Sequence, residues 1–388
     1  MEVLFVSHKY PPATGGMEKQ SFELIEGMRA YATVHQLVYT GQENILLFFL
    51  RLEKRIVELL NKYPSIALIH FNDALIGSLA LRHHHHYPHV KKVVTVHGLD
   101  VVFPWGYYQR KILPLFNRFD RIVAVSEATK RAIVARGVST DRVVVINNGV
   151  DHAFADLSQQ SVVGSPEVGH ALLAGQKPYF VMLGRPVKRK GFSWFLREVA
   201  PRLPDAATIV MAGPLNTRRR FVWALARCCP SAWRHLIALF LGYPSDEREI
   251  FRLLRQPSKG AKVTHLGKLP LADLQTLLQH ASAFLMPNIP IAGDMEGFGL
   301  VCLEASGAGT LVVAAEIDGI TDAVLHRRNG LLLPAADADA WVERLNHIMN
   351  HPTPYRGIAA DFQQYTLQHF GWDKMCRAYA SCFAALLE

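Results

Sequence analysis

The strongest constraint on the fold is a repeated alternation of short apolar runs with helical segments. Residues 3–6 form an apolar run, residues 10–16 a loop rich in Pro and Gly, and residues 17–30 show helical spacing. Strand, Gly-rich loop and helix in this order begin a doubly wound α/β domain with a parallel sheet. Further strands are expected in the first part of the chain at residues 34–39, 67–70, 93–96, 121–125 and 143–146.

The same alternation starts again at residue 179. Residues 179–183 predict a strand, which is followed by a loop at 184–191 and by a helix. Later strands are expected at residues 207–212, 263–267, 283–286, 311–314 and 331–333. The polar residues 155–177 are typical of a linker. A chain of 388 residues is long enough for two domains with a core each, so two Rossmann-like doubly wound domains are expected.

Composition excludes several classes of protein. Half of the residues are hydrophobic and 19% are charged, which excludes a disordered chain. The five cysteines have no regular spacing, and Cys228 and Cys229 are adjacent, so neither a disulfide framework nor a zinc site is expected. The first apolar run is too short for a signal peptide, and no run approaches the roughly 20 residues of a membrane span. We therefore expect a cytoplasmic protein.

Charge leaves a choice of partners. The net charge is +9 and the pI is about 9.3, which permits nucleic acid, an anionic membrane or a phosphorylated substrate. The sequence contains no recognisable nucleic-acid-binding module, so nucleic acid is not expected as a partner.

The stretch from Asp294 to Thr310 carries the first group of candidate site residues. Glu296 and Glu304 are separated by seven residues, and the Gly297-Phe298-Gly299 turn between them would let backbone approach a ligand closely. A helix is predicted at residues 300–308, where free amides favour a phosphate and Glu304 could accept hydrogen bonds from hydroxyl groups. The macrodipole alone also favours a Glu in a first helical turn, so this pair does not by itself establish a site.

The loop at 184–191 and two strand ends supply further candidates. Arg185 offers a planar guanidinium and Lys190 a point charge, and both suit a diphosphate, although a solvated basic turn would look the same. The pair Gly15-Gly16 follows the first strand, where a phosphate contact is plausible. His97 ends the strand at 93–96, and ligands of open α/β sheets bind at such ends; a capping role would explain it equally well.

These separated motifs resemble those of the family-4 retaining glycosyltransferases. The resemblance rests on Glu-x7-Glu with Gly-Phe-Gly after the first acid, on Arg185 and Lys190 at the family spacing, and on the segments 147–151 and 268–269. It implies the glycosyltransferase B fold, with two Rossmann-like domains facing across a cleft. Residues 1–165 would bind the acceptor, with the helix at 370–388 returning to this domain. Residues 175–369 would bind the nucleotide sugar.

The resemblance also assigns roles. The donor would be a nucleoside-diphosphate sugar, and a hexose-type sugar would pass to a glycan, lipid-linked or small-molecule acceptor with retention of configuration, in polysaccharide or glycolipid assembly. No metal and no cofactor would be needed. The implied catalytic residues are His97, Glu296, Arg185 and Lys190. The implied donor-binding residues are Gly15, Gly16, Gly191, Leu269, Phe298, Gly299, Leu300, Val301 and Glu304.

Two segments depart from the family pattern or invite another interpretation. An insertion at about 217–260 combines arginines with aromatic residues between 217 and 243, which is typical of an element that lies on an anionic membrane; a helical hairpin packed on its own domain is the alternative. The four consecutive histidines at 83–86 are interpreted as a solvated loop, because adjacent histidines rarely share one ion.

Other functions stay open for the same fold. A nucleotide-sugar epimerase would work without an acceptor, and a phosphorylase would require phosphate. A non-catalytic glycan-binding protein is a third reading, against which the four charged residues Arg185, Lys190, Glu296 and Glu304 argue.

Overall fold

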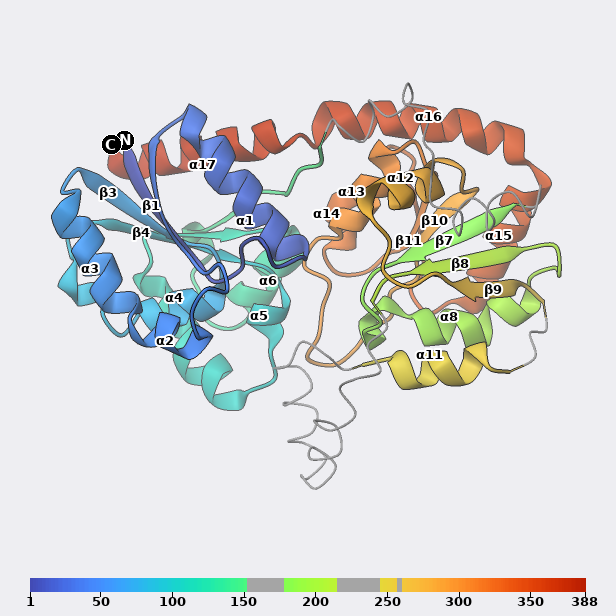
Figure 1. The fold of residues 1–388 in the computed structure, drawn as a ribbon, viewed down its shortest axis with the longest axis horizontal. Helices are drawn as coiled ribbons and strands as arrows, with labels where there is room; N and C mark the ends of the chain where they lie inside the picture. Colours follow the sequence, from blue (N-terminus) through green and yellow to red (C-terminus); the bar gives the residue numbers. More distant parts are fainter. Residues whose placement is uncertain (152–177, 215–244, 257–259) are drawn as a thin grey trace. The chain divides into compact units, whose positions relative to one another are not determined.

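The protein consists of two compact units, each built on one parallel sheet of six strands (Figure 1). The computed structural model describes residues 1–151, 178–214, 245–256 and 260–388. Unit 1 comprises Met1–Gly149 with Phe370–Glu388, and unit 2 comprises Val150–His369. The prediction of two Rossmann-like domains is confirmed.

All strands of the unit 1 sheet are parallel, but the order in which the chain adds them reverses between the second and third positions. Its strands, in spatial order, are β2 (Thr33–Val38), β1 (Glu2–Ser7), β3 (Ile66–Phe71), β4 (Lys91–Val96), β5 (Arg121–Ala124) and β6 (Val143–Val145). The chain winds outward in one direction from β1 and in the other from β3, so loops after these two strands diverge. In open α/β sheets ligands bind at the carboxyl ends of strands at such a switch point.

The helices of unit 1 cover its sheet (Figure 1): α1 (Gly16–Gly27), α2 (Ile45–Leu50), α3 (Leu52–Lys62), α4 (Ala74–Ala80), α5 (Leu99–Val102) and α6 (Glu127–Val134). Residues 45–62 form two helices, α2 and α3, in place of one continuous helix. The break lies at Arg51, whose backbone leaves the helical region with φ −94° and ψ 0°. The strongly apolar α2 is largely exposed, with Leu46 at 66% and Leu50 at 79% exposure.

The last helix, α17 (Trp372–Leu387), belongs to unit 1 and completes its interior. Its Tyr379 hydroxyl lies 2.9 Å from the Thr95 hydroxyl in β4, and the same Thr95 oxygen lies 2.8 Å from Nε2 of His70 in β3. Burial lowers the pKa of His70 to about 3, so this ring is a neutral partner in the network. Phe383, one turn further along α17, is fully buried against the rings of Phe5 and His70.

The sheet of unit 2 has the strand order of the dinucleotide-binding Rossmann fold. Its spatial order is β12 (Leu331–Leu333), β11 (Val312–Ala315), β10 (Ala283–Met286), β7 (Tyr179–Leu183), β8 (Thr208–Ala212) and β9 (Lys262–His265). The direction of winding reverses between β7 and β10, which pair in parallel. This reversal places the loops after β7 and β10 at the position where such folds bind ligands.

Seven helices of unit 2 are described: α8 (Phe192–Glu198), α11 (Glu247–Leu254), α12 (Leu271–Gln279), α13 (Leu300–Gly307), α14 (Ile320–Ala323), α15 (Ala338–Asn350) and α16 (Pro352–His369). The helices α15 and α16 were not predicted, although Trp341, Leu345 and Ile348 recur at helical spacing and are buried in α15. Helix α13 is held against α16, because the Ser306 and Thr366 hydroxyls lie 2.7 Å apart.

Two sequence expectations fall mainly outside the described residues. The linker at 155–177 and the basic, aromatic segment 217–243 lie there, and α11 is the part of the insertion that is described. Among the described helices, none is long and apolar enough to cross a bilayer.

The histidine run differs from the expected solvated loop. His84–His86 form one turn of 3-10 helix, but His83 is only 5% exposed. Its Nδ1 lies 2.9 Å from the Tyr87 hydroxyl, so this histidine is a hydrogen-bonded part of the interior. The interpretation as a solvated loop is therefore wrong for His83, because a phenol four residues later provides the partner that burial requires.

Gly191 allows the loop after β7 to touch the end of β10. Its φ is +67°, and a Cβ atom there would lie 1.9 Å from the Pro287 carbonyl oxygen. We predict that Gly191→Ala lowers the free energy of unfolding by more than about 2 kcal/mol, measured by chemical denaturation. Gly357→Ala in α16 is the control, because nothing lies within 4 Å of its Cβ position and alanine favours a helix. Equal stability of the two variants would contradict the prediction.

Candidate active site

In each unit, polar side chains gather where the strands on either side of the switch point end. In unit 2 they follow β7 and β10, and in unit 1 they follow β1, β3 and β4. We describe the two groups separately, beginning with unit 2.

Glu296 is the centre of a buried ion cluster in unit 2. Its side chain is 13% exposed, and its Oε2 lies 2.9 Å from Nζ of Lys190 and 3.3 Å from Nε of Arg189. The amide of Asn288 donates to the same oxygen at 3.4 Å. Burial alone would raise the pKa of Glu296, but the charges of Lys190 and Arg189 outweigh it and lower the pKa to about 2. The carboxylate is therefore ionised at neutral pH, with one oxygen anchored.

The second carboxylate oxygen of Glu296, Oε1, does not take part in these contacts. Within the described part of the chain, no hydrogen-bond partner of Oε1 is found. A carboxylate oxygen that is held in position without a partner can accept a hydrogen bond from a ligand hydroxyl. The low pKa makes Glu296 a weak base, so its geometry suits positioning rather than proton transfer.

Arg189 connects Glu296 to two more acids. Asp294 has a fully buried side chain and lies 3.6 Å from Nη1 of Arg189. Asp318 accepts a hydrogen bond from the Glu296 amide at 3.1 Å, and the Gly319 amide donates to the Glu296 carbonyl at 3.0 Å. Burial raises the pKa values of Asp294 and Asp318, and Arg189 opposes this shift in both. The segment after β10 is thus tied to the loop after β7 and to the loop after β11.

Glu304 lies in α13 near the same cluster. The buried Cys302 thiol, whose pKa burial raises, lies within electrostatic range of Lys190, Glu296 and Glu304. The helix begins at Leu300 after Gly299, whose φ is +96°, and Phe298 before it is buried. The structure therefore brings Glu304 toward the cluster that contains Glu296 and Lys190, at the first turns of a helix whose amides can bind an anion.

The remaining candidates of unit 2 surround this cluster. Arg185 is exposed and directly follows Gly184 at the end of β7, whereas Lys190 is only 7% exposed. Gly184 and Gly213 end the neighbouring strands β7 and β8, and a Cβ atom at Gly213 would lie 2.1 Å from the Gly184 carbonyl oxygen. Leu269 lies in the half-buried loop after β9. Lys190 is hence an internal ion-pair partner as well as a candidate ligand for phosphate, and Arg185 is an exposed cation of this loop.

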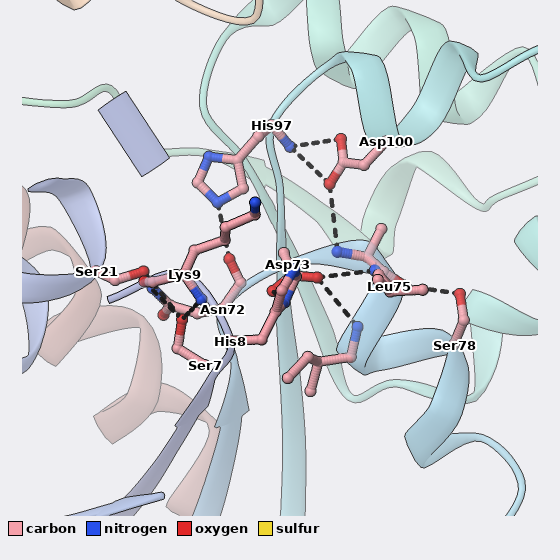
Figure 2. A network of polar contacts seen from close by, with 12 residues as sticks. Ser7, His8, Lys9, Ser21, Asn72, Asp73, Leu75, Ser78, His97 and Asp100 are labelled. Carbon is pink, nitrogen blue, oxygen red and sulfur yellow. Dashed lines mark hydrogen bonds and ion pairs between the residues drawn. The ribbon is translucent and has the colours of Figure 1, made fainter. Parts of the chain in front are cut away.

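His97 in unit 1 is anchored by one ring nitrogen (Figure 2). Its Nε2 donates to the Asn72 carbonyl at 2.8 Å, since a carbonyl only accepts. Its backbone amide donates to Asp100, at 2.9 Å to Oδ1 and 3.1 Å to Oδ2. In the neutral ring Nδ1 is then an acceptor, and it has no hydrogen-bond partner in the part of unit 1 that the structure describes. The arrangement presents Nδ1 for a ligand.

His8 and Asp73 form a second anchored pair beside His97 (Figure 2). Nδ1 of His8 lies 2.8 Å from Oδ2 of Asp73, and their side chains are 8% and 2% exposed. The other oxygen of Asp73 caps α4 by accepting from the amides of Leu75 and Ile76 at 2.9 and 3.0 Å. Burial would raise the pKa of Asp73, but His8 and the cap hydrogen bonds lower it. Asp73 is thus a carboxylate, and Nε2 of His8 is the ring atom left for a ligand.

The glycine pair of unit 1 lies in an exposed loop. Gly15 precedes α1, and Glu18 in the first turn of this helix lies 3.7 Å from Lys9, which follows β1. A Cβ atom at Gly15 would lie 2.3 Å from Oε2 of Glu18. Gly15 therefore allows the acid to fold back over the loop.

Sequence analysis missed several residues of both groups. In unit 2 these are Arg189, Asn288, Asp294 and Asp318, and in unit 1 they are His8, Asn72, Asp73 and Asp100. Their shared signal is position, since all but Asp294 lie within six residues after the carboxyl end of a strand. Among the described residues, no group of three or more His, Cys, Asp or Glu could hold a metal ion.

Comparison with known families decides the class. The family model described as "Glycosyl transferases group 1" matches residues 169–367, which is more than half of the chain, and "Glycosyltransferase Family 4" matches residues 2–154. The chain belongs to the family-4 glycosyltransferases. The resemblance seen in the sequence is thereby confirmed.

Individual relatives are distant. The chain is 25% identical over 304 residues to an alpha-maltose-1-phosphate synthase of Mycolicibacterium smegmatis, covering 73% of this chain and 70% of the relative. It is 34% identical over 260 residues to a D-inositol 3-phosphate glycosyltransferase of Mycolicibacterium paratuberculosis, covering 66% of this chain but only 50% of that protein.

Solved structures share the fold over the whole chain. The crystal structure of Anabaena Alr3699/HepE in complex with UDP has a TM-score of 0.72 at 20% identity and covers 99% of this glycosyltransferase and 100% of that chain. The apo lipopolysaccharide outer core galactosyltransferase WaaB has a TM-score of 0.61 at 16% identity, again with 99% and 100% coverage.

The low pKa of Glu296 makes stability depend on pH. The folded pKa of about 2 lies below the ordinary glutamate pKa of 4.5, so the ion cluster stabilises the fold above about pH 4.5, and this stabilisation is lost as the pH falls toward 2. We predict that Glu296→Gln removes about 2 kcal/mol of this pH-dependent loss, measured as the free energy of unfolding between pH 5 and 2.5. The exposed Glu343→Gln is the control. If wild type and Glu296→Gln lose stability in parallel, Glu296 is not held as an ion pair.

Proposed function

We propose that this family-4 glycosyltransferase moves a hexose-type sugar from a nucleoside-diphosphate sugar to a glycan, lipid-linked or small-molecule acceptor, with retention of configuration. The observation that carries the proposal is the ion cluster of Glu296, Lys190 and Arg189 at the switch point of unit 2. The UDP and UDP-glucose in the complexes of the Anabaena protein support this class of donor.

Charge development determines what the cluster must do. When the bond between the anomeric carbon and the phosphate oxygen breaks, negative charge grows on the diphosphate and positive charge on the sugar ring. Arg185, Lys190 and the amides at the start of α13 stabilise the first of these charges. Lys190 has three N–H donors, and the contact to Glu296 occupies one of them, so the ammonium can serve both groups. Gly191, Phe298, Gly299 and Val301 shape the backbone around the diphosphate.

Anchored acceptors position the sugar and the ribose. Oε1 of Glu296 and Nδ1 of His97 accept hydrogen bonds from hydroxyl groups of the donated sugar, while their partner atoms keep the two side chains rigid. Glu304 holds the ribose hydroxyls, and main chain near Leu269 lies against the base. In this proposal Gly15 and Gly16 approach the diphosphate, and unit 1 takes the acceptor.

The reaction in this proposal uses no metal and no cofactor, because Arg185 and Lys190 supply the positive charge for the leaving diphosphate. It takes place in the cytoplasm, in the assembly of a cell-surface polysaccharide or glycolipid. Residues 217–243 touch an anionic membrane surface, and flotation with anionic and neutral vesicles tests this contact directly.

The donor assay separates this reaction from the alternatives of the same fold. The protein is incubated with a panel of nucleotide sugars, and diphosphate release is measured with an acceptor mixture, without acceptor and with inorganic phosphate. Release that requires an acceptor, that survives EDTA and that gives a retained anomeric signal by NMR is the expected result. Epimerised donor without an acceptor, or release that requires phosphate, would replace the proposal by an epimerase or a phosphorylase.

The loop after β7 supplies the variants for this assay. We predict that Lys190→Ala and Arg185→Ala each lower kcat/KM for the donor roughly 100-fold or more, since each removes a charge that stabilises the leaving group. Lys188→Ala is the matched control, because Lys188 is an exposed cation of the same loop. Near wild-type turnover in both test variants would show that the diphosphate is bound elsewhere. Circular dichroism spectra establish that the variants are folded.

A further inference from the structure

A basic hollow lies in unit 2 beside β12, α15 and α16. Its volume is about 620 Å³. We use the name basic hollow for this site, whose polar lining includes Arg327, Arg328, Arg344, His347, Tyr355 and Asp361.

The basic hollow is at the opposite edge of the sheet from the candidate active site. Arg327 and Arg328 belong to the turn that immediately precedes β12, so they lie at the amino ends of the strands. The cluster around Glu296 follows β7 and β10, at the carboxyl ends. Because all strands of this sheet are parallel, the two sites cannot share a ligand.

Hydrogen bonds fix the turn that carries two of the arginines. Asn329 is 1% exposed; its side chain accepts from the Leu325 amide at 2.7 Å and donates to the Ala323 carbonyl at 2.8 Å. The Arg327 amide donates to the Gly330 carbonyl at 2.8 Å, and Arg327 has a φ of +61°. A left-handed conformation costs a non-glycine residue free energy and persists where the surrounding structure imposes it. The turn therefore holds the backbone of Arg327 and Arg328 in place.

A chain of hydrogen bonds fixes the facing wall. Nη1 of Arg344 donates to the Tyr355 hydroxyl at 3.0 Å, and this hydroxyl lies 3.1 Å from Nδ1 of His347. Since the guanidinium only donates, the Tyr355 proton goes to Nδ1 of His347, which leaves Nε2–H as the second polar group of a neutral ring. The groups of this chain of hydrogen bonds that remain for a ligand, the other N–H groups of Arg344 and Nε2–H of His347, are therefore donors.

The lining has an excess of positive charge and an apolar part. Three arginines stand against the single carboxylate of Asp361. The dipole at the end of α15 would favour the nearby histidines without any ligand, but it does not account for the two arginines of the turn. Leu331, Ile358 and Phe362 supply an apolar surface between the polar groups.

We propose that the basic hollow is a second ligand site, which binds a phosphate ester. The arginines take the phosphoryl oxygens, for which the guanidinium fork has the matching geometry. The carbon part of the ester lies against Ile358 and Phe362. A soluble phosphorylated metabolite and a phospholipid headgroup share this chemistry.

Phenyl phosphate is the probe for the soluble ester, and phenol is its uncharged counterpart. Binding is followed by NMR on the ¹³C-labelled methyl groups of Ile358, whose signals are assigned with Ile358→Val. Because Ile358 lines the basic hollow, ester that binds in the active site does not shift these signals. We expect saturable shifts with phenyl phosphate and none with phenol. The variant R327N/R328Q should weaken binding at least about tenfold, as expected for lost charge-assisted hydrogen bonds. Asn suits the left-handed position, and the Tm shows that the fold is intact.

The control and the lipid arm complete the test. R356Q removes an exposed arginine of α16 outside the lining and should bind like wild type. Vesicles of phosphatidylcholine with and without phosphatidylglycerol test the headgroup source: binding that needs phosphatidylglycerol and is lost in R327N/R328Q assigns the ester to a lipid. The proposal is overturned if neither probe binds, or if R327N/R328Q binds both as wild type does.

Discussion

The rest of the unit 2 site depends on one constraint: a charged side chain that is removed from water must be paired with an opposite charge. Glu296 and Lys190 are almost fully buried, and each is acceptable there only because the other is present. The pair joins the loop after β7 to the segment after β10, and Arg189 extends the connection to Asp294. Gly191 permits the close approach of these two segments. The site is therefore rigid because separate pieces of chain neutralise each other.

A common design recurs in both units. Glu296, His97 and His8 each use one polar atom to bind a neighbouring element, and each keeps a second polar atom without a partner among the described residues. Such side chains lose little rotamer entropy when a ligand arrives, because they are already fixed. Glu296 is anchored by a lysine, His97 by a backbone carbonyl and His8 by a capping carboxylate. Different chemical groups thus fix the three side chains in the same way.

The sequence predicted the fold better than the site. Strands such as 179–183 and 283–286 were predicted with their observed bounds, because short apolar runs bounded by Pro, Ser or Gly are typical of buried strands. Glu296 and Lys190 were identified through their motif. Arg189 and Asp73 were not, because their significance is a partner 65 to 107 residues away, which no local pattern encodes. The break at Arg51 and the buried His83 likewise depend on tertiary contacts.

The contact between α17 and β4 has a consequence for biosynthesis. Tyr379 forms a continuous network with Thr95 and His70, but it is translated 284 residues after Thr95. Until α17 emerges from the ribosome, Phe5 and its neighbours have an unfilled side where Phe383 will later pack. Unit 1 therefore reaches its final interior only after unit 2 has been translated, because α17 follows unit 2 in the chain.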